Sequence, residues 1–232
     1  MNLEGKRVLI SGGSSRADLA IAQALLAKGA QVVVAERGTD AFAGAVDQLR
    51  KGGEHVEGIA ADVATEEGRR TTLQRATEIL TGLDVLINNA SDIETRRLDE
   101  TSAAEIQATA QIDLLAPILL IWAALPSLRA SGSDALVVNV SSSLAPAAAP
   151  INVTYAAMRA GLASFGEELR EELKSTGIRL LTVYRHGTEP RVTQSDHADP
   201  DLGYLDESAS ALAGAVVNGI ESDLPEVFFV SG

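Results

Sequence analysis

The chain has 232 residues, 46% of them hydrophobic, which is enough to form the core of one α/β domain. Its 32 acidic and 19 basic residues give a formal net charge of -13, which argues against nucleic acid and anionic membrane surfaces as partners. There is no cysteine, and His55, His186 and His197 lack the spacing of metal ligands, so neither a disulfide nor a metal site is expected.

Apolar, β-branched segments typical of buried strands alternate along the chain with segments of helical periodicity. Strands are expected at 7–10, 31–35, 56–60, 85–87, 135–140, 179–184 and 227–230. Helices are expected between them, at 15–28, 39–51, 66–81, 102–129, 152–175 and 206–220. Strands separated by helices need right-handed crossovers, so the pattern predicts a doubly wound, seven-stranded parallel sheet with helices on both faces.

The whole chain, residues 1–232, is expected to form one domain, because no linker or internal repeat divides it. Residues 185–206 are polar and long for a connection inside a compact domain, and such a segment is typical of a loop or lid. The N-terminus lacks the apolar segment of a signal peptide, and no apolar run approaches the ~18 residues of a membrane span. A cytoplasmic protein without membrane contact is therefore expected.

The stretch SGGSSRADLA at 11–20 lies where an α/β protein that binds a dinucleotide carries its glycine-rich phosphate turn. Gly12 is present, and Ser14 and Ser15 are candidate N-caps for the following helix. Arg16 and Asp18 stand where further glycines would let the backbone approach a pyrophosphate. Asp18 could instead accept the N–H bonds of the first helical turn, so the helix would cap itself.

Five motifs follow one another in a familiar order: SGGSS at 11, Asp62 with Val63, NNAS at 88–91, NVSS at 139–142, and Tyr155 placed 13 residues after Ser142. In these motifs the chain resembles the short-chain dehydrogenase/reductase family over nearly its whole length. The resemblance implies a Rossmann-like α/β fold and hydride transfer between NAD(P) and a carbonyl or alcohol.

The resemblance assigns cofactor contacts to seven residues: Gly12, Ser14, Arg16, Glu36, Asp62, Asn89 and Ala90. Glu36 closes the second strand, where the family has an acid that binds the adenosine ribose; it would favour NAD, although a solvated strand end explains it as well. Ser142 would polarise the carbonyl and Tyr155 would act as acid and base. Alternatively, Ser142 satisfies backbone groups at the end of a strand and Tyr155 packs its ring into the core.

Four further positions depart from the family. Arg159 stands where the family has a lysine, four residues after the tyrosine, and Asp113 stands where it has a helix-borne asparagine. The two exchanges together predict an Asp113–Arg159 salt bridge in the catalytic cleft. The pair Arg185 and His186 replaces the family's proline and glycine beside the nicotinamide.

These departures favour a protein with degraded motifs that binds no NAD(H) or binds it weakly, and that serves as a non-catalytic subunit or small-molecule binder. Two alternatives stay open: an NAD(P)-dependent oxidoreductase, and a lyase or isomerase that uses Ser142, Tyr155 and Arg159. The long apolar helices at 102–129 and 152–175 predict a homo-oligomer, a dimer or tetramer, or a hetero-oligomer with an active subunit of the same family.

Overall fold

The computed structural model describes residues 1–232 except 14, 52–54, 92–96, 143–152, 187–206 and 231–232. The strands are β1 Arg7–Ser11, β2 Gln31–Glu36, β3 Val56–Ala60, β4 Val85–Asn88, β5 Leu136–Ser142, β6 Arg179–His186 and β7 Glu226–Val230. The α-helices are α1 Arg16–Leu26, α2 Asp40–Lys51, α3 Glu66–Leu80, α4 Ala103–Ala110, α5 Ala116–Ala130, α6 Val153–Leu173 and α7 Glu207–Glu221. Short 3-10 turns lie at Leu98–Glu100, Gly132–Asp134 and Lys174–Thr176.

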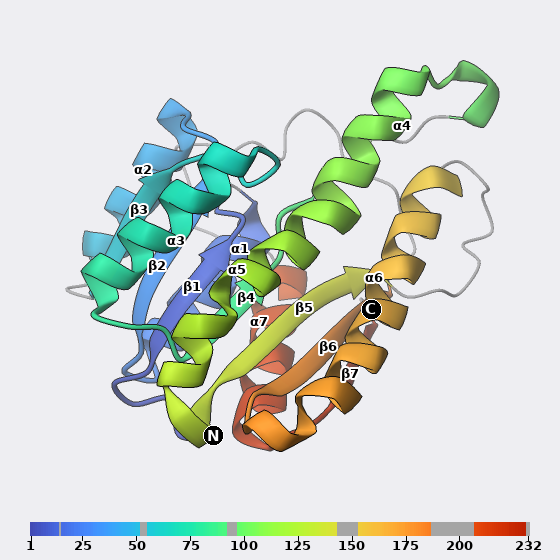
Figure 1. Cartoon of the computed structure of the whole chain (residues 1–232). Coiled ribbons are helices and arrows are strands. Elements are labelled where there is room, and N and C mark those ends of the chain that lie inside the picture. Colours follow the sequence, from blue (N-terminus) through green and yellow to red (C-terminus); the bar gives the residue numbers. More distant parts are fainter. Residues whose placement is uncertain (14, 52–54, 92–96, 143–152, 187–206, 231–232) are drawn as a thin grey trace.

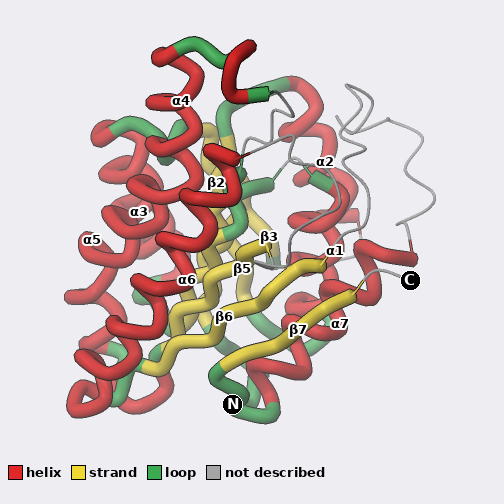
Figure 2. The backbone as a smooth tube through the Cα atoms, turned by 90° about the vertical axis from the view of Figure 1, so that its right-hand side faces the viewer, coloured by secondary structure: helices red, strands yellow, loops and turns green. Residues whose placement is uncertain are grey.

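All seven strands form one sheet in the order β3-β2-β1-β4-β5-β6-β7, and each neighbouring pair is parallel. This confirms the predicted doubly wound sheet. Figure 2 shows α1, α2 and α7 on one side of it and α3, α5 and α6 on the other. Successive strand residues point to opposite faces, so Val8 and Ile10 pack with α1 and α7, whereas Leu9 packs with α3 and α5.

The predicted fourth helix is interrupted. Residues Gln111–Leu115 between α4 and α5 form a π-helical turn, in which the Ala116 N–H bonds to the Gln111 carbonyl. The cause lies at Pro117, which has no N–H for the carbonyl of Asp113, four residues earlier, and whose ring would crowd that carbonyl in a regular α-helix. The wider turn relieves this conflict.

The same stretch, Ala103–Ala130, is long and apolar enough to cross a membrane by length and composition, with a mean hydropathy of 1.7 over its best window. Core helices of soluble proteins meet this criterion too. Here α5 packs against the sheet through buried residues such as Leu120, Ile121 and Leu128.

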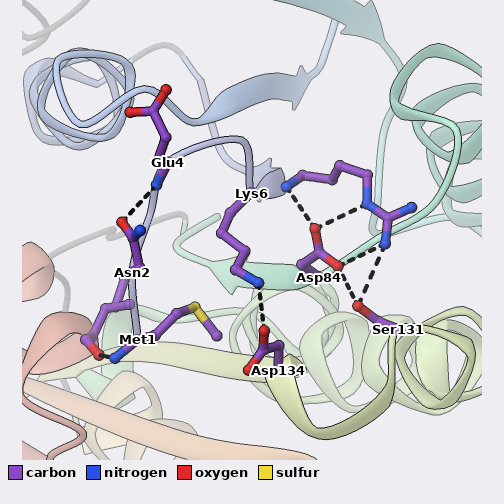
Figure 3. A network of polar contacts seen from close by, with 9 residues as sticks. Met1, Asn2, Glu4, Lys6, Asp84, Ser131 and Asp134 are labelled. Atoms are coloured by element: carbon purple, nitrogen blue, oxygen red, sulfur yellow. Dashed lines mark hydrogen bonds and ion pairs between the residues drawn. The ribbon is translucent and has the colours of Figure 1, made fainter.

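The amino edge of the sheet is held by a buried carboxylate, Asp84, which precedes β4 (Figure 3). Arg7 donates to it from its backbone N–H and Nε, both at 2.9 Å, and from its terminal nitrogen at 2.7 Å, and Ser131 donates a further bond. Burial by itself would raise the pKa of Asp84, but the bonds from Arg7 and Ser131 outweigh it and lower the pKa to about 2. The opposite, carboxyl edge carries the residues that the motifs single out.

Of the segment predicted as a loop or lid, Arg185 and His186 belong to β6, so that prediction was two residues too long at its start. Residues 187–206 lie outside the described part of the chain, as does Ser14. For Ser142 the structure describes the backbone at the end of β5, paired with Arg185 of β6.

Candidate functional site

The candidate site lies at the point where the chain reverses its direction of travel across the sheet. From β1 the chain continues to β2 on one side, and it later returns to β4 on the other side (Figure 1), so the turns after β1 and β4 lie next to each other at the carboxyl ends of these strands, and we call the place between them the crevice. In open α/β sheets this is where ligands bind. Gly12 and Gly13 follow β1, and Asn89 and Ala90 follow β4.

These two turns approach each other closely. The Gly12 N–H donates to the Ala35 carbonyl and the Asn89 N–H to the Ser11 carbonyl, both at 2.9 Å. Gly12 has φ +104°, and a Cβ there would lie 2.9 Å from the Ala90 nitrogen. Glycine is therefore required at this position both by backbone conformation and by space.

Helix α1 begins at this crevice and is capped by its own side chains. Ser15 is the N-cap: its hydroxyl oxygen accepts the Asp18 N–H at 3.2 Å, while the Asp18 carboxylate accepts the Ser15 N–H at 3.0 Å. This reciprocal capping box confirms that the helix caps itself. The Ser15 hydroxyl also donates to Asp18 at 2.6 Å, and the Asn89 amide donates to the other carboxylate oxygen.

Asp18 is the buried acid of the site, with a relative exposure of 3%. Burial raises the pKa of its carboxyl to about 6, with nearby Glu36 adding to the rise, while the bonds from Ser15 and Asn89 act against it. The carboxyl therefore gains a proton far more readily than an ordinary aspartate.

Glu36 is the last residue of β2 and Asp62 follows β3, so both lie at the same carboxyl edge of the sheet. One Glu36 oxygen accepts the Gly13 N–H at 3.1 Å, and the other accepts the Arg37 N–H at 2.8 Å and lies 3.7 Å from the Arg37 guanidinium. Asp62 accepts the Ala64 N–H at 2.9 Å, within the turn that leads to α3. Both acids thus have backbone partners, and their assigned cofactor roles stay predictions.

On the other side of the crevice, the π-helical turn carries Asp113 toward α6. A terminal nitrogen of the Arg159 guanidinium lies 3.1 Å from the Asp113 carboxylate, and both side chains are buried. The predicted Asp113–Arg159 salt bridge is confirmed. Arg159 also donates to the Val140 carbonyl at 3.3 Å, and the Ser91 hydroxyl donates to Asp113 at 2.7 Å.

Sequence reasoning missed Ser91, although it is the last residue of the NNAS motif. Its hydroxyl ties the turn after β4 to the buried ion pair, a contact between residues 22 positions apart that no local pattern reveals. The available signal was a hydroxyl residue at the carboxyl edge, next to the predicted crevice.

Tyr155 lies one helical turn before Arg159 on α6, and the guanidinium carbon is 5.2 Å from the centre of its ring. This distance allows a cation–π contact. The structure therefore brings together Tyr155, Arg159, Asp113 and Ser91 beside the end of β5. The side chain of Ser142 lies outside the described residues, so its assigned role is untested.

Comparison with known proteins decides the family. The family model for short chain dehydrogenases matches residues 6–201. The chain belongs to the short-chain dehydrogenase family. It is 32% identical over 228 residues to a ketoacyl reductase, HetN, of Nostoc sp. strain PCC 7120, covering 97% of this chain and 78% of the relative. It is 29% identical over 183 residues to a 3-oxoacyl-[acyl-carrier-protein] reductase, FabG, of Vibrio cholerae, covering 79% and 73% of the two chains.

Among solved structures, this chain resembles a short chain dehydrogenase from Burkholderia cenocepacia J2315, which was solved in complex with NADP. The TM-score is 0.83 and the sequence identity 26%, and the match covers 100% of this chain and 99% of that one. This likeness overturns the prediction of no or weak NAD(H) binding. The error was to treat Asp18 as a fixed charge in the path of a phosphate: its carboxyl is turned onto Asn89 and Ser15, and its pKa lies near 6.

The crevice fits a dinucleotide on this structure's own evidence. Gly12 lets the turns after β1 and β4 pack in direct contact, Glu36 presents a carboxylate able to accept bonds from ribose hydroxyls, and Arg16 opens α1 with a partly exposed side chain. Asp18 is neutral once protonated and then no longer repels a phosphate. In the described part of the chain, no group of three or more acidic, histidine or cysteine side chains could hold a metal ion.

Proposed function

We propose that this short-chain dehydrogenase is an NAD(P)-dependent oxidoreductase that interconverts a carbonyl and an alcohol. The observation that carries the proposal is the placement of Tyr155 beside the Arg159 guanidinium, at the carboxyl edge of the sheet and next to the crevice. A tyrosine with a fixed cation against its ring is suited to donate its hydroxyl proton to a developing alkoxide and to take it back in the reverse direction.

In this reaction the residues of the site have separate roles. NAD(P), when bound, supplies or accepts the hydride. Tyr155 moves the proton at its hydroxyl oxygen, and Ser142 holds the substrate oxygen by a hydrogen bond. Arg159 keeps a positive charge beside the reacting groups, and Asp113 is a positioning residue that fixes the guanidinium through the 3.1 Å contact.

Cofactor contacts are proposed at Gly12, Ser14, Arg16, Glu36, Asp62, Asn89 and Ala90. Glu36 supports a preference for NAD over NADP, because its carboxylate would repel a 2′-phosphate. Arg37, 3.7 Å from that carboxylate, weakens the repulsion, so we expect a preference rather than an exclusion.

The test is oxidation of NADH and NADPH, followed by absorbance, with a panel of carbonyl compounds. A 3-ketoacyl thioester comes first, because two relatives are named as ketoacyl or oxoacyl reductases. Tyr155→Phe should abolish turnover with unchanged NADH binding. The matched control is Tyr184→Phe, which removes a hydroxyl from a ring that stacks on Phe228 at the β6–β7 pair and should leave turnover intact. Equal activity of Tyr155→Phe and the wild type would refute the proposal.

A second candidate is a member that binds NAD(P) but does not turn over, alone or as a subunit beside an active relative. The observation that favours it is the closed Asp113–Arg159 pair, in which the guanidinium is already engaged by Asp113 and the Val140 carbonyl. NADH binding without oxidation for every carbonyl tested would support this candidate.

We also propose a cytoplasmic homo-oligomer assembled through α4, α5 and α6. Family members typically bind small molecules and form oligomers. Trp122 and Leu115 support this surface, since they are 71% and 43% exposed along the same helical stretch. Sedimentation velocity should show a species larger than the 24.2 kDa chain, and Trp122→Glu should shift it toward monomer. A wild-type monomer at micromolar concentration would refute the assembly.

A further inference from the structure

Asp18 joins the two turns that border the crevice. Its carboxylate accepts the Ser15 N–H and hydroxyl on the α1 side and the Asn89 amide on the β4 side. One of its oxygens lies 2.8 Å from where a Cβ on Gly12 would be. The acid therefore lies beside Gly12, where the two turns are in contact, and its carboxylate is at the start of α1.

The charged groups around Asp18 leave its own charge uncompensated. Glu36, from the end of β2, is a second acid and disfavours the ionised form. Arg37 is engaged with Glu36, and Arg16 lies on the first turn of α1 itself. Asn89, after β4, is neutral, and no basic side chain among the described residues forms an ion pair with Asp18. Its partners are thus hydroxyl, amide and backbone N–H groups.

A pyrophosphate carries two negative charges that do not titrate near neutral pH. When it approaches the start of α1 it meets the uncompensated carboxylate of Asp18, and like charges disfavour each other most strongly where water is excluded. A neutral carboxyl removes the repulsion. The oxygen that faces Ser15 then carries the proton and donates it to the Ser15 hydroxyl, which turns to accept it, while the Ser15 N–H and the Asn89 amide keep their acceptors.

We propose that Asp18 makes dinucleotide binding proton-linked: the dinucleotide binds to the form in which this carboxyl is protonated, so that binding takes up a proton and affinity falls as the pH rises. This inference rests on the proposed function, because it needs a dinucleotide in the crevice.

The direction of the effect follows from linkage. In the free protein the pKa of Asp18 is about 6, raised chiefly by burial, and a bound pyrophosphate raises it further. Below about pH 6 the group is protonated in both states and affinity is constant. Above it, the dissociation constant should rise by about tenfold per pH unit until the pKa of the bound state is reached.

The experiment is calorimetric titration with NADH between pH 5.5 and 8.5. NADH is preferred to NADPH because the 2′-phosphate of NADPH titrates in the same range. At pH 7 the titration is repeated in buffers of different ionisation enthalpy, so that the slope of the observed enthalpy gives the number of protons taken up. This measurement needs only the wild-type protein, and we expect an uptake close to one proton.

Asp18→Asn is the matched variant, because the amide is isosteric and its oxygen can still accept the bonds from Ser15, while its NH2 group faces Asn89, whose side-chain amide can turn to present its oxygen. It should bind NADH with an affinity that is independent of pH and take up no proton. Glu67→Gln, which neutralises an exposed acid on α3, is the control, and it should retain the pH dependence of the wild type.

Wild-type binding that is equal at every pH, or a slope that survives in Asp18→Asn, would overturn the inference and leave the proposed function standing. Absence of NADH binding in the wild type and in both variants at every pH would overturn the proposed function, and this inference with it.

Discussion

The buried Asp113–Arg159 pair makes a quantitative prediction about stability. We consider three variants: Asp113→Leu, Arg159→Met, and the two together. In each single variant one charge stays in a buried site without its partner, and the cost expected for such a site is about 3–5 kcal/mol. That is a fifth or more of the ~5–15 kcal/mol that stabilises a typical domain. The double variant removes both charges and should be nearly neutral.

An exposed pair on α3 provides the control. Glu67 and Arg70 lie 2.6 Å apart, closer than Asp113 and Arg159 at 3.1 Å, but both side chains are exposed to solvent. A double-mutant cycle on this pair should give a coupling of no more than ~0.5 kcal/mol, since water screens the charges and the side chains lose entropy. The comparison therefore separates the effect of burial from that of distance.

The assay is urea denaturation followed by far-ultraviolet circular dichroism, because Trp122 is too exposed to report core unfolding by its fluorescence. Single variants of the buried pair that each lose less than about 1 kcal/mol would refute the reasoning, because the cost expected for an unpaired buried charge would be absent. So would a double variant that loses the sum of the two single losses.

Two further predictions concern stability elsewhere in the fold. Gly166→Ala, in α6, should stabilise the protein by ~0.5–1 kcal/mol, because its Cβ would meet Leu180 and Thr182 at an ordinary 3.4 Å. Gly219→Ala, in α7, gains the same helix propensity but should destabilise the protein, because its Cβ would lie 2.8 Å from a methyl group of Val227. Thermal unfolding of both variants tests the contrast, and equal shifts of the melting temperature would contradict it. Asp84, with its pKa lowered to about 2, should contribute stability above about pH 4 that is lost as the pH falls toward 2. Urea titrations at pH 2–6 should show that Asp84→Asn lacks this loss of stability in acid. An acid profile identical to that of the wild type would disprove the prediction.

Much of the fold was predictable because the local signals agreed with one another. Each strand was placed within two residues, since buried parallel strands read as short apolar runs bounded by helical segments. The π-helical turn at 111–115 was missed, although Pro117 indicates it. Because proline has no N–H, the carbonyl four residues earlier in the chain loses its partner, and the helix is disturbed there and not at the proline itself.

The candidate site was predictable where two exchanges explained each other. Asp113 and Arg159 changed together relative to the family, and charge pairing accounts for both. Ser91 was missed because its bond to Asp113 exists only in the folded protein. The cofactor prediction was wrong for a similar reason: burial and hydrogen-bond partners, which set the behaviour of Asp18, cannot be read from its position in a motif.

The site thus contains two aspartates at positions where the family has uncharged residues, and their partners give them different consequences. Asp113 faces a guanidinium at 3.1 Å, so its charge is compensated and its removal should be felt as a loss of stability. Asp18 is bonded to an amide, a hydroxyl and a backbone N–H, none of which carries a charge. Its ionisation is therefore free to respond to whatever charge enters the crevice, and its removal should be felt in the pH dependence of binding. These assignments would be contradicted if Asp18→Asn changed only the stability of the protein and Asp113→Leu changed only the pH dependence of NADH binding.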